Sequence, residues 1–332
     1  MNLKTLTIIL CATLLFACTK TDPKQVTITG KITNPIGESV IFSNQDTAYS
    51  TTANKDGSFS ISFLLDSAEY LNFEHGVERT AMFVKPSDKI NLTIDTELFD
   101  ETIKYEGSEE SSFLAKLYLL EEENDFFAAM DSLNSEQFSN MLEGYSAEFL
   151  ALLSKVTDAD FIVKAKERIK NTTSNWGDRK TAIDNMPKEG EPAIDFTYPD
   201  KDGNEFSLAS FKGTLIYVDV WATWCGPCKA EIPYLQKLEE EYQGYCTITF
   251  LSVSVDTDKD AWLKMVAEKE MGGIQLWADG WSEITKSYAI FGIPRFMLFS
   301  ADGNVISTNA PRPSSDEIRG LLDANLGGLP NL

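Results

Sequence analysis

Two cysteines with two residues between them carry the chemistry that this sequence predicts most directly. Cys225 and Cys228 enclose a Gly-Pro dipeptide, and Trp224 comes directly before the first of them. The apolar, β-branched run at 214–220 predicts a buried strand, and the Glu, Lys, Gln and Leu residues of 229–242 predict a helix. The pair therefore lies at a helix N-terminus, where free backbone N–H groups and the helix dipole stabilise a thiolate. This position predicts redox chemistry.

Structural uses of the cysteine pair explain the sequence less well. A zinc site needs four ligands, and the chain offers no second cysteine pair and a single histidine, His75. We expect His75 to lie in a solvated loop, and one histidine supports a Ser-His-Asp triad only if it is recruited from another domain. Cys246 begins an expected strand and is best explained as a small buried side chain. We therefore expect one working dithiol, without a metal and without a cofactor.

Two acidic residues flank the dithiol. Asp219 lies six residues before Cys225, in the middle of a run that is otherwise typical of a buried strand. Ionising a buried carboxyl group is costly, so its pKa should be raised, which suits a proton acceptor for Cys228. The alternative is a carboxylate that is hydrogen-bonded at a strand edge. Glu231 stands in the first turn of the expected helix, where the helix dipole favours an acid.

The dithiol and its surroundings resemble the thioredoxin superfamily, and among its members the envelope-anchored TlpA/ResA-type thiol-disulfide oxidoreductases. Trp-Cys-Gly-Pro-Cys at 224–228 is the thioredoxin dithiol motif, and the similarity extends over about 189–325. The resemblance implies a thioredoxin-like α/β domain, in which helices flank a central mixed sheet. It also implies that Cys225 is the attacking nucleophile and that Cys228 resolves the mixed disulfide.

Other positions match the superfamily one by one. Asp219 matches an acid that accepts a proton in thioredoxins, and Glu231 matches a glutamate that lines the TlpA/ResA active-site cavity and tunes the thiols. Ile293-Pro294 matches the cis-proline opposite the dithiol, where the bend exposes backbone groups to an extended substrate. We expect Trp224 to cover the sulfurs and to contact the partner. The matches imply catalytic roles for both acids, and substrate binding by Trp224, Ile293 and Pro294.

The N-terminal segment 1–17 predicts export. Lys4 precedes an apolar run at 6–16 that is too short to span a bilayer as a stable helix. Leu15-Phe-Ala-Cys18 resembles the bacterial lipobox, which implies cleavage before Cys18 and a lipid on that cysteine. The alternative is an ordinary secretory signal that is cleaved near the same point. We therefore expect a bacterial cell-envelope protein that a lipid anchors to a membrane and that faces the periplasm.

Between this signal and the dithiol domain the pattern changes twice. Residues 18–106 alternate as strands do, with a hairpin turn at Asp56-Gly57, and predict a small antiparallel β domain. This part resembles the β-rich N-terminal domain of many envelope lipoproteins of Bacteroidetes. Residues 107–188 follow the helical i, i+3, i+4 rule and end in a linker with proline and glycine. The last part, 189–332, is the expected thioredoxin-like domain.

The composition excludes one class of partner. The formal charge is −22 over 332 residues, and such an acidic surface repels phosphate backbones, so we expect no nucleic acid. The simplest explanation of this charge is that it keeps the protein soluble in a crowded envelope. No run after the signal approaches the ~18 apolar residues of a membrane-spanning helix.

The leading hypothesis is an envelope disulfide reductase that acts on exported proteins. The Gly-Pro dipeptide is that of thioredoxin, whose potential is about −270 mV, well below the about −120 mV of strong oxidants. A reductant in an oxidising compartment must be recharged, so the resemblance implies a membrane electron donor, and clients such as apocytochromes or damaged exported proteins. Arg295 replaces the small polar residue of thioredoxin, so analogy does not identify the clients.

Two other functions stay open at this point. Residues 191–210 also resemble peroxiredoxins, which carry a proline seven residues and a threonine three residues before their cysteine. Val218 and Ala222 stand at those positions here, which disfavours a thiol peroxidase. A tethered binding lipoprotein is the third reading, with the thioredoxin part as a scaffold. The intact dithiol favours the reductase.

Overall fold

The computed structural model describes residues 22–245 and 247–326. The predictions for the signal segment, for Cys18 and for Cys246 fall outside these residues. The chain forms two compact units, which are considered separately below. The first contains the residues up to 129 together with 140–173, and the second contains 130–139 together with the residues from 174 onward.

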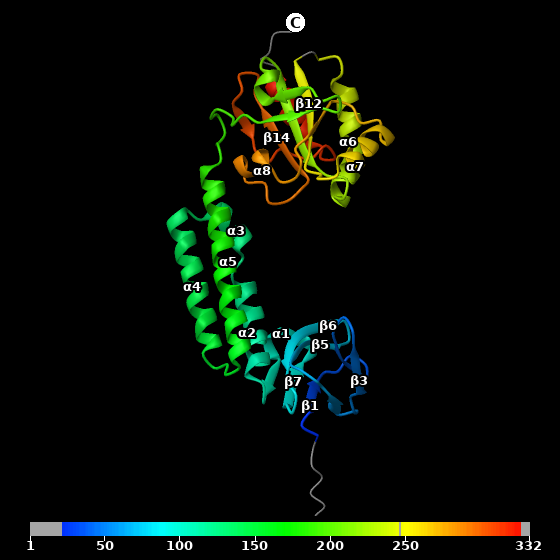
Figure 1. Ribbon diagram of the computed structural model, residues 1–332, viewed down its shortest axis with the longest axis vertical. Helices are drawn as coiled ribbons and strands as arrows, with labels where there is room; N and C mark the ends of the chain where they lie inside the picture. The colour runs from blue at the N-terminus through cyan, green and yellow to red at the C-terminus, as the bar shows by residue number, and fades with distance from the viewer. Residues whose placement is uncertain (1–21, 246, 327–332) are drawn as a thin grey trace, which may run out of the picture. The chain divides into compact units, whose positions relative to one another are not determined.

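The first unit begins with two four-stranded sheets, which Figure 1 draws from blue to cyan. The strand orders are β4-β1-β7-β8 and β3-β2-β5-β6, and every pair is antiparallel except β1 with β7. Alternate apolar side chains of the strands fill one core, which explains the period-two pattern of the sequence. The strands are β1 (Gln25–Thr33), β2 (Ser39–Ser43), β3 (Ala48–Thr52), β4 (Ser58–Leu64), β5 (Glu69–His75), β6 (Glu78–Val84), β7 (Lys89–Asp95) and β8 (Lys104–Glu106).

The structure corrects the expected hairpin at Asp56-Gly57. A tight turn is present, with Gly57 in the left-handed region at a φ of 82°. The strands on either side of it belong to different sheets, since β3 pairs with β2 and β4 pairs with β1. A turn motif shows where the chain reverses but not which strand it pairs with.

The structure also corrects His75, because the expectation of a solvated loop is wrong. His75 is the last residue of β5 and is 1% exposed. Its Nε2 accepts a hydrogen bond of 2.9 Å from the Ile36 N–H, and its Nδ1 lies 2.8 Å from the Ser39 carbonyl oxygen, to which it donates. Gly76, directly after it, has a φ of 66°, so the glycine that suggested a loop belongs to the turn that follows the strand.

Helices make up the middle of the chain, as the sequence predicts. They are the 3₁₀ turn η1 (Thr96–Leu98), α1 (Phe99–Thr102), α2 (Glu109–Glu123), α3 (Phe126–Ser132), α4 (Ser135–Leu153) and α5 (Ala159–Asn185). In the first unit Phe113 of α2 makes edge contacts with Phe149 of α4 and Phe161 of α5, with ring centres 5.1 and 5.6 Å apart. The apolar stripes of these helices therefore pack on their own protein.

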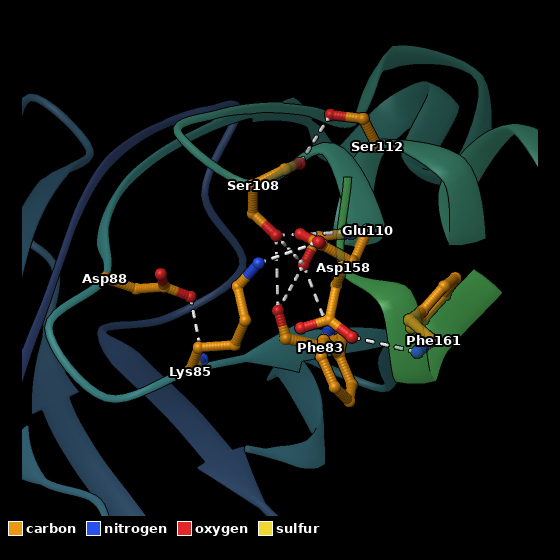
Figure 2. Close-up of polar contacts among 9 residues, drawn as sticks. Phe83, Lys85, Asp88, Ser108, Glu110, Ser112, Asp158 and Phe161 are labelled. Atoms are coloured by element: carbon orange, nitrogen blue, oxygen red, sulfur yellow. Dashed lines mark hydrogen bonds and ion pairs between the residues drawn. The ribbon is translucent and has the colours of Figure 1, made fainter. Parts of the chain in front are cut away.

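A buried ion pair joins the sheets of the first unit to its helices (Figure 2). Lys85, after β6, reaches Glu110 in the first turn of α2 at 2.7 Å, and the glutamate side chain is almost fully buried. Ser108, the N-cap residue of α2, donates to the Phe83 carbonyl oxygen of β6. Asp158 caps α5 by accepting from the Phe161 N–H. Buried charges need such partners, so this cluster holds the start of α2 against β6.

The second unit contains a five-stranded mixed sheet in the order β13-β12-β11-β14-β15 and a separate hairpin of β9 with β10. β11 and β12 are parallel, and β14 runs antiparallel to β11. Its further elements after α5 are β9 (Thr197–Pro199), β10 (Glu205–Ser207), η2 (Leu208–Phe211), β11 (Leu215–Trp221), α6 (Gly226–Tyr242), β12 (Ile248–Ser254), α7 (Lys259–Glu268), β13 (Ile274–Trp277), α8 (Glu283–Ser287), β14 (Arg295–Phe299), β15 (Val305–Ser307) and α9 (Glu317–Leu326). This is the thioredoxin-like α/β fold that the sequence predicts.

Helices cover both faces of this sheet. α6 and α9 pack with Leu215, Tyr217, Phe296 and their neighbours into one apolar cluster. α7 and α8 pack with Val218 and its neighbours into the other. β11 is buried along its whole length because it lies in the centre of the sheet between the two layers.

Candidate active site

The cysteines of the motif form a disulfide across the first turn of α6. Their Cα atoms lie 5.3 Å apart, both residues are buried, and Cys225 is the N-cap residue of the helix. The Cys228 N–H donates a hydrogen bond of 3.1 Å to the Cys225 sulfur. A free N–H group of the helix end therefore already points at this sulfur. After reduction, the same group and the helix dipole favour a thiolate at Cys225.

Asp256 fixes the loop that leads into the dithiol, and the sequence analysis did not single it out. It follows β12 and is almost fully buried. Its carboxylate accepts hydrogen bonds from the Thr223 N–H, at 2.9 Å for the shorter contact, and from the Thr223 hydroxyl at 2.7 Å. The Ser254 hydroxyl donates to it as well. An acid directly after a buried strand was the available signal, because side chains at the carboxyl ends of neighbouring parallel strands lie close together.

Asp219 is buried in the central strand β11, which lies between β12 and β14. It pairs with Ser252 on β12 and with Phe296 on β14, and its Oδ1 finds no hydrogen-bond partner in the described part of the chain. Burial, followed by the negative charge of Glu239, raises the pKa of Asp219 to about 8, while a hydrogen bond with Ser252 acts in the opposite direction. The pKa of Asp219 is therefore raised, as the sequence predicts, although a hydrogen bond with Ser252 still acts on the carboxyl group.

Glu231 is buried in α6 and is tied to the loop before α9. Its Oε2 accepts a hydrogen bond of 3.0 Å from the Ser314 N–H, and its Oε1 accepts one of 2.9 Å from the Ser314 hydroxyl. Arg312 approaches Oε1 at 3.9 Å. These contacts give Glu231 a structural connection that neither of the sequence-based explanations included.

The residues expected to bind substrate lie on two segments. The Ile293-Pro294 peptide bond is cis and directly precedes β14, whose first residue, Arg295, pairs with Val220 near the end of β11. The dithiol loop follows that same end of β11, so both segments meet at one edge of the sheet. The Trp224 side chain, in the dithiol loop, is 60% exposed and offers an apolar contact surface.

Two features are absent from the described residues. No group of three or more His, Cys, Asp or Glu side chains in residues 22–245 and 247–326 is arranged to hold a metal ion. Over the same residues, no helical segment combines the length and the apolar character that a bilayer-spanning helix requires.

Comparisons with known proteins agree with this site. Residues 188–322 match the Redoxin family. Thiol-disulfide oxidoreductase ResA of Bacillus thuringiensis is 29% identical over 117 residues, which are 35% of this chain and 66% of the Bacillus protein. Thioredoxin of Pseudomonas aeruginosa is 31% identical over 111 residues, which are 33% of this chain and 79% of that protein.

Among solved structures, a Bacteroides vulgatus protein assigned as a thiol-disulfide oxidoreductase is 43% identical to this chain. The match covers 42% of this chain and 96% of the other, with a TM-score of 0.40. The Redoxin match falls on the part of the chain that carries the dithiol. The chain belongs to the thioredoxin superfamily and is of its TlpA/ResA type.

Proposed function

We propose that this protein reduces disulfide bonds of exported proteins in the bacterial cell envelope. The observation that carries the proposal is the Cys225–Cys228 disulfide at the N-terminus of α6, with the buried carboxyl of Asp219 in the strand before it. A pair that opens and closes between two states needs one stabilised thiolate and one route for a proton, and these residues supply both.

The first step is an attack by the Cys225 thiolate on one sulfur of a client disulfide. A bond forms between Cys225 and that sulfur, the client S–S bond breaks, and the other client sulfur leaves as a thiolate that takes a proton from water. The exposed Trp224 side chain and the backbone around Ile293 and Pro294 would hold an extended client segment beside the disulfide.

The second step frees the client. The Cys228 thiol gives its proton to the Asp219 carboxylate and attacks the Cys225 sulfur, so the Cys225–client bond breaks and the second client thiolate leaves. The client has then gained two electrons, and the protein holds the disulfide that the structure contains. Asp219 returns its proton to water before the next cycle.

The direction of electron flow follows from the motif and from the compartment. A Gly-Pro dipeptide goes with potentials of about −270 mV in thioredoxin, which favours a reductant over an oxidant. The dithiol must then be restored by a membrane electron donor that itself carries a dithiol. A lipid on Cys18, which lies outside the described residues, would keep the protein at the membrane beside that donor.

A trapping experiment tests this function. Cys228→Ser in the full chain removes the resolving thiol, so clients should accumulate as mixed disulfides on Cys225 when the variant is expressed in its native envelope. The matched control carries Cys225→Ser as well and should trap nothing. If the single variant also recovers no client, the reductase proposal fails.

A second measurement tests the direction. Equilibration of the purified protein with glutathione or dithiothreitol buffers gives the potential of the Cys225–Cys228 pair. We expect a value near that of thioredoxin, about −270 mV. A value near −120 mV would replace the reductase with an oxidase or isomerase.

A further inference from the structure

The C-terminal part of α5 lies against the loop that leads to the cis-proline, and both belong to the second unit. The guanidinium carbon of Arg179, in α5, lies 4.9 Å from the ring centre of Phe291. Phe291 comes three residues before Pro294, which is at the same edge of the sheet as the dithiol loop. A helix from outside the thioredoxin-like fold therefore borders the proposed client-binding edge.

Two aromatic rings hold the Arg179 side chain in place. Trp176, one helical turn earlier in α5, has its ring centre 5.1 Å from the same guanidinium carbon. A cation over an aromatic face is attracted by the negative charge of that face, and stacking leaves the N–H groups at the rim of the planar guanidinium able to donate. The two rings therefore fix the position of the cation without using its hydrogen-bond donors.

Arg179 has no acidic partner in the described part of the chain. Within residues 22–245 and 247–326 it makes no ion pair and no hydrogen bond. Lys180, the next residue, is different, because it is buried and lies 2.5 Å from Asp184. Arg179 is partly exposed and Phe291 is 38% exposed, so a segment that binds at this edge can contact both side chains.

A second cation stands on the other side of the cis-proline. Arg295 follows Pro294 directly and is partly buried. Burial lowers the pKa of Arg295, and the negative charge of Asp131, in α3, acts against this. Asp131 therefore competes with an acidic ligand at Arg295. No carboxylate of the described residues lies within ion-pair distance of Arg179, so Arg179 is the cation better placed to bind an acid from another protein.

We propose that Arg179, with the Phe291 ring beside it, determines client specificity by binding a carboxylate of an acidic client segment. The proposal rests on the proposed function, in which the client chain runs past Ile293 and Pro294. A planar guanidinium binds a Glu or Asp side chain through two parallel hydrogen bonds, and a guanidinium that is already held in place loses less entropy on binding.

The same geometry predicts where the acid stands in the client. An extended chain advances about 3.3 Å per residue, and Phe291 is three residues from Pro294. If the client cysteine lies opposite Pro294, the acidic residue should therefore be about three residues away from that cysteine.

Reduction of model disulfide peptides by the full-length, reduced protein tests the proposal. The peptides carry Glu or Gln at a single position, which is moved stepwise away from the disulfide cysteine on either side. Physiological ionic strength is used, because it screens the repulsion by the net charge of −22 beyond about 8 Å. In Arg179→Gln the half-saturating concentration of the best Glu peptide should rise by about threefold to tenfold, with an unchanged maximal rate. The Gln peptides should be unaffected.

Three variants separate this contact from general effects. Lys188→Gln removes one positive charge from an exposed residue after α5 and should change neither kind of peptide. Arg179→Lys keeps the charge but loses the planar fork, so it should restore only part of the affinity. Phe291→Leu should weaken the Glu peptide more than the Gln peptide, and it should add little to Arg179→Gln, because both substitutions act on one contact.

A small neutral pyridyl disulfide reports on the dithiol itself and should react at the same rate in wild type and in Arg179→Gln. A loss that this probe shows to the same extent as the Glu peptide would mean a damaged dithiol, and would overturn the specificity role.

Two further outcomes would overturn the inference. A ratio of Glu-peptide to Gln-peptide affinity that is the same in Arg179→Gln as in wild type, at every position, shows that α5 takes no part in client choice. Equal changes in Arg179→Gln and Lys188→Gln show a general effect of net charge. These results differ from a failure of the trapping experiment, which would remove the reductase function and leave the peptide preference of the purified protein measurable.

Discussion

At the scale of single residues, the site holds a carboxyl group where the fold alone would favour an apolar side chain. Asp219 stands in a strand whose other residues are all buried, and its Oδ1 has no partner in the described part of the chain. Keeping such a group ionised is costly, so the protein tolerates a loss of stability at this position. Folding alone therefore does not explain Asp219, whereas the proton-accepting role proposed above would.

Asp219→Asn should raise stability, and the gain should grow with pH. The pKa of Asp219 is about 8 in the folded state and about 3.9 when unfolded, so the folded state binds more protons between these values and loses stability as pH rises through them. The variant lacks this loss. Between pH 5.5 and 8.5 its advantage over wild type should increase by about 3 kcal/mol.

Urea unfolding of both oxidised proteins at these two pH values measures the difference. Glu240→Gln serves as the control, since its side chain is on the surface of α6. An advantage of Asp219→Asn that is equal at pH 5.5 and 8.5 would contradict a raised pKa at this site.

The residues of the site differ in how far sequence alone predicts them. Cys225 and Cys228 are separated by only two residues, and Asp219 lies in the strand directly before them, so local patterns are enough. Asp256 reaches the site only through the pairing of β12 with β11, and its place after a buried strand was the one local signal for it. The prediction of a solvated His75 was wrong because its burial depends on strands that lie far away in the chain.

At the scale of elements, the Glu231 side chain connects the first turns of α6 to the loop before α9. The Glu231 carboxylate accepts two hydrogen bonds from Ser314, in the loop that leads to α9. Since Glu231 lies one turn after Cys228, this contact also limits how far the first turns of α6 can move when the disulfide opens. A role in tuning the thiols would act through this restraint.

Ser314→Ala should weaken this connection. It removes the hydroxyl donor and leaves a buried carboxylate with one hydrogen bond fewer, which costs about 1.5–3 kcal/mol for a bond to a charged group. Urea unfolding of the oxidised protein gives the free energy of unfolding. The neighbouring Ser315→Ala is the control, because the Ser315 hydroxyl only accepts an exposed bond of 3.3 Å from the Glu317 N–H. Equal effects of the two substitutions would argue against a structural role for the Glu231 contact.

The elements themselves were predictable where their pattern is local. β11 and α6 follow from an apolar run and a helix signal, and the structure contains both. β13 was missed because its four residues are too few to show an alternation. The two β sheets of the first unit were predicted as strands, but their partners were not, since pairing is set by contacts between distant segments.

At the scale of the whole molecule, the negative net charge and the positive charge of Arg295 would have opposite effects on a client. The chain carries a formal charge of −22, which attracts basic proteins over long distances at low salt. Arg295 lies next to the cis-proline, is partly buried, and has no carboxylate within ion-pair distance in the part of the chain that is described. Its charge favours acidic segments, but only at short range, because salt screens exposed charges beyond about 8 Å at physiological ionic strength.

The preference for clients should therefore depend on salt. Two disulfide peptides that differ only in Lys or Glu beside the disulfide are compared by single-turnover reduction at low and at physiological ionic strength. We expect the Lys peptide to react faster at low salt, by about tenfold or more, and most of this advantage to vanish at physiological salt. Arg295→Gln should increase the advantage of the Lys peptide at both ionic strengths. Arg319 is paired with Glu241 on α6, so Arg319→Gln should leave this advantage nearly unchanged. If the ratio of the two reduction rates changes neither with salt nor in Arg295→Gln, shape and not charge selects the clients.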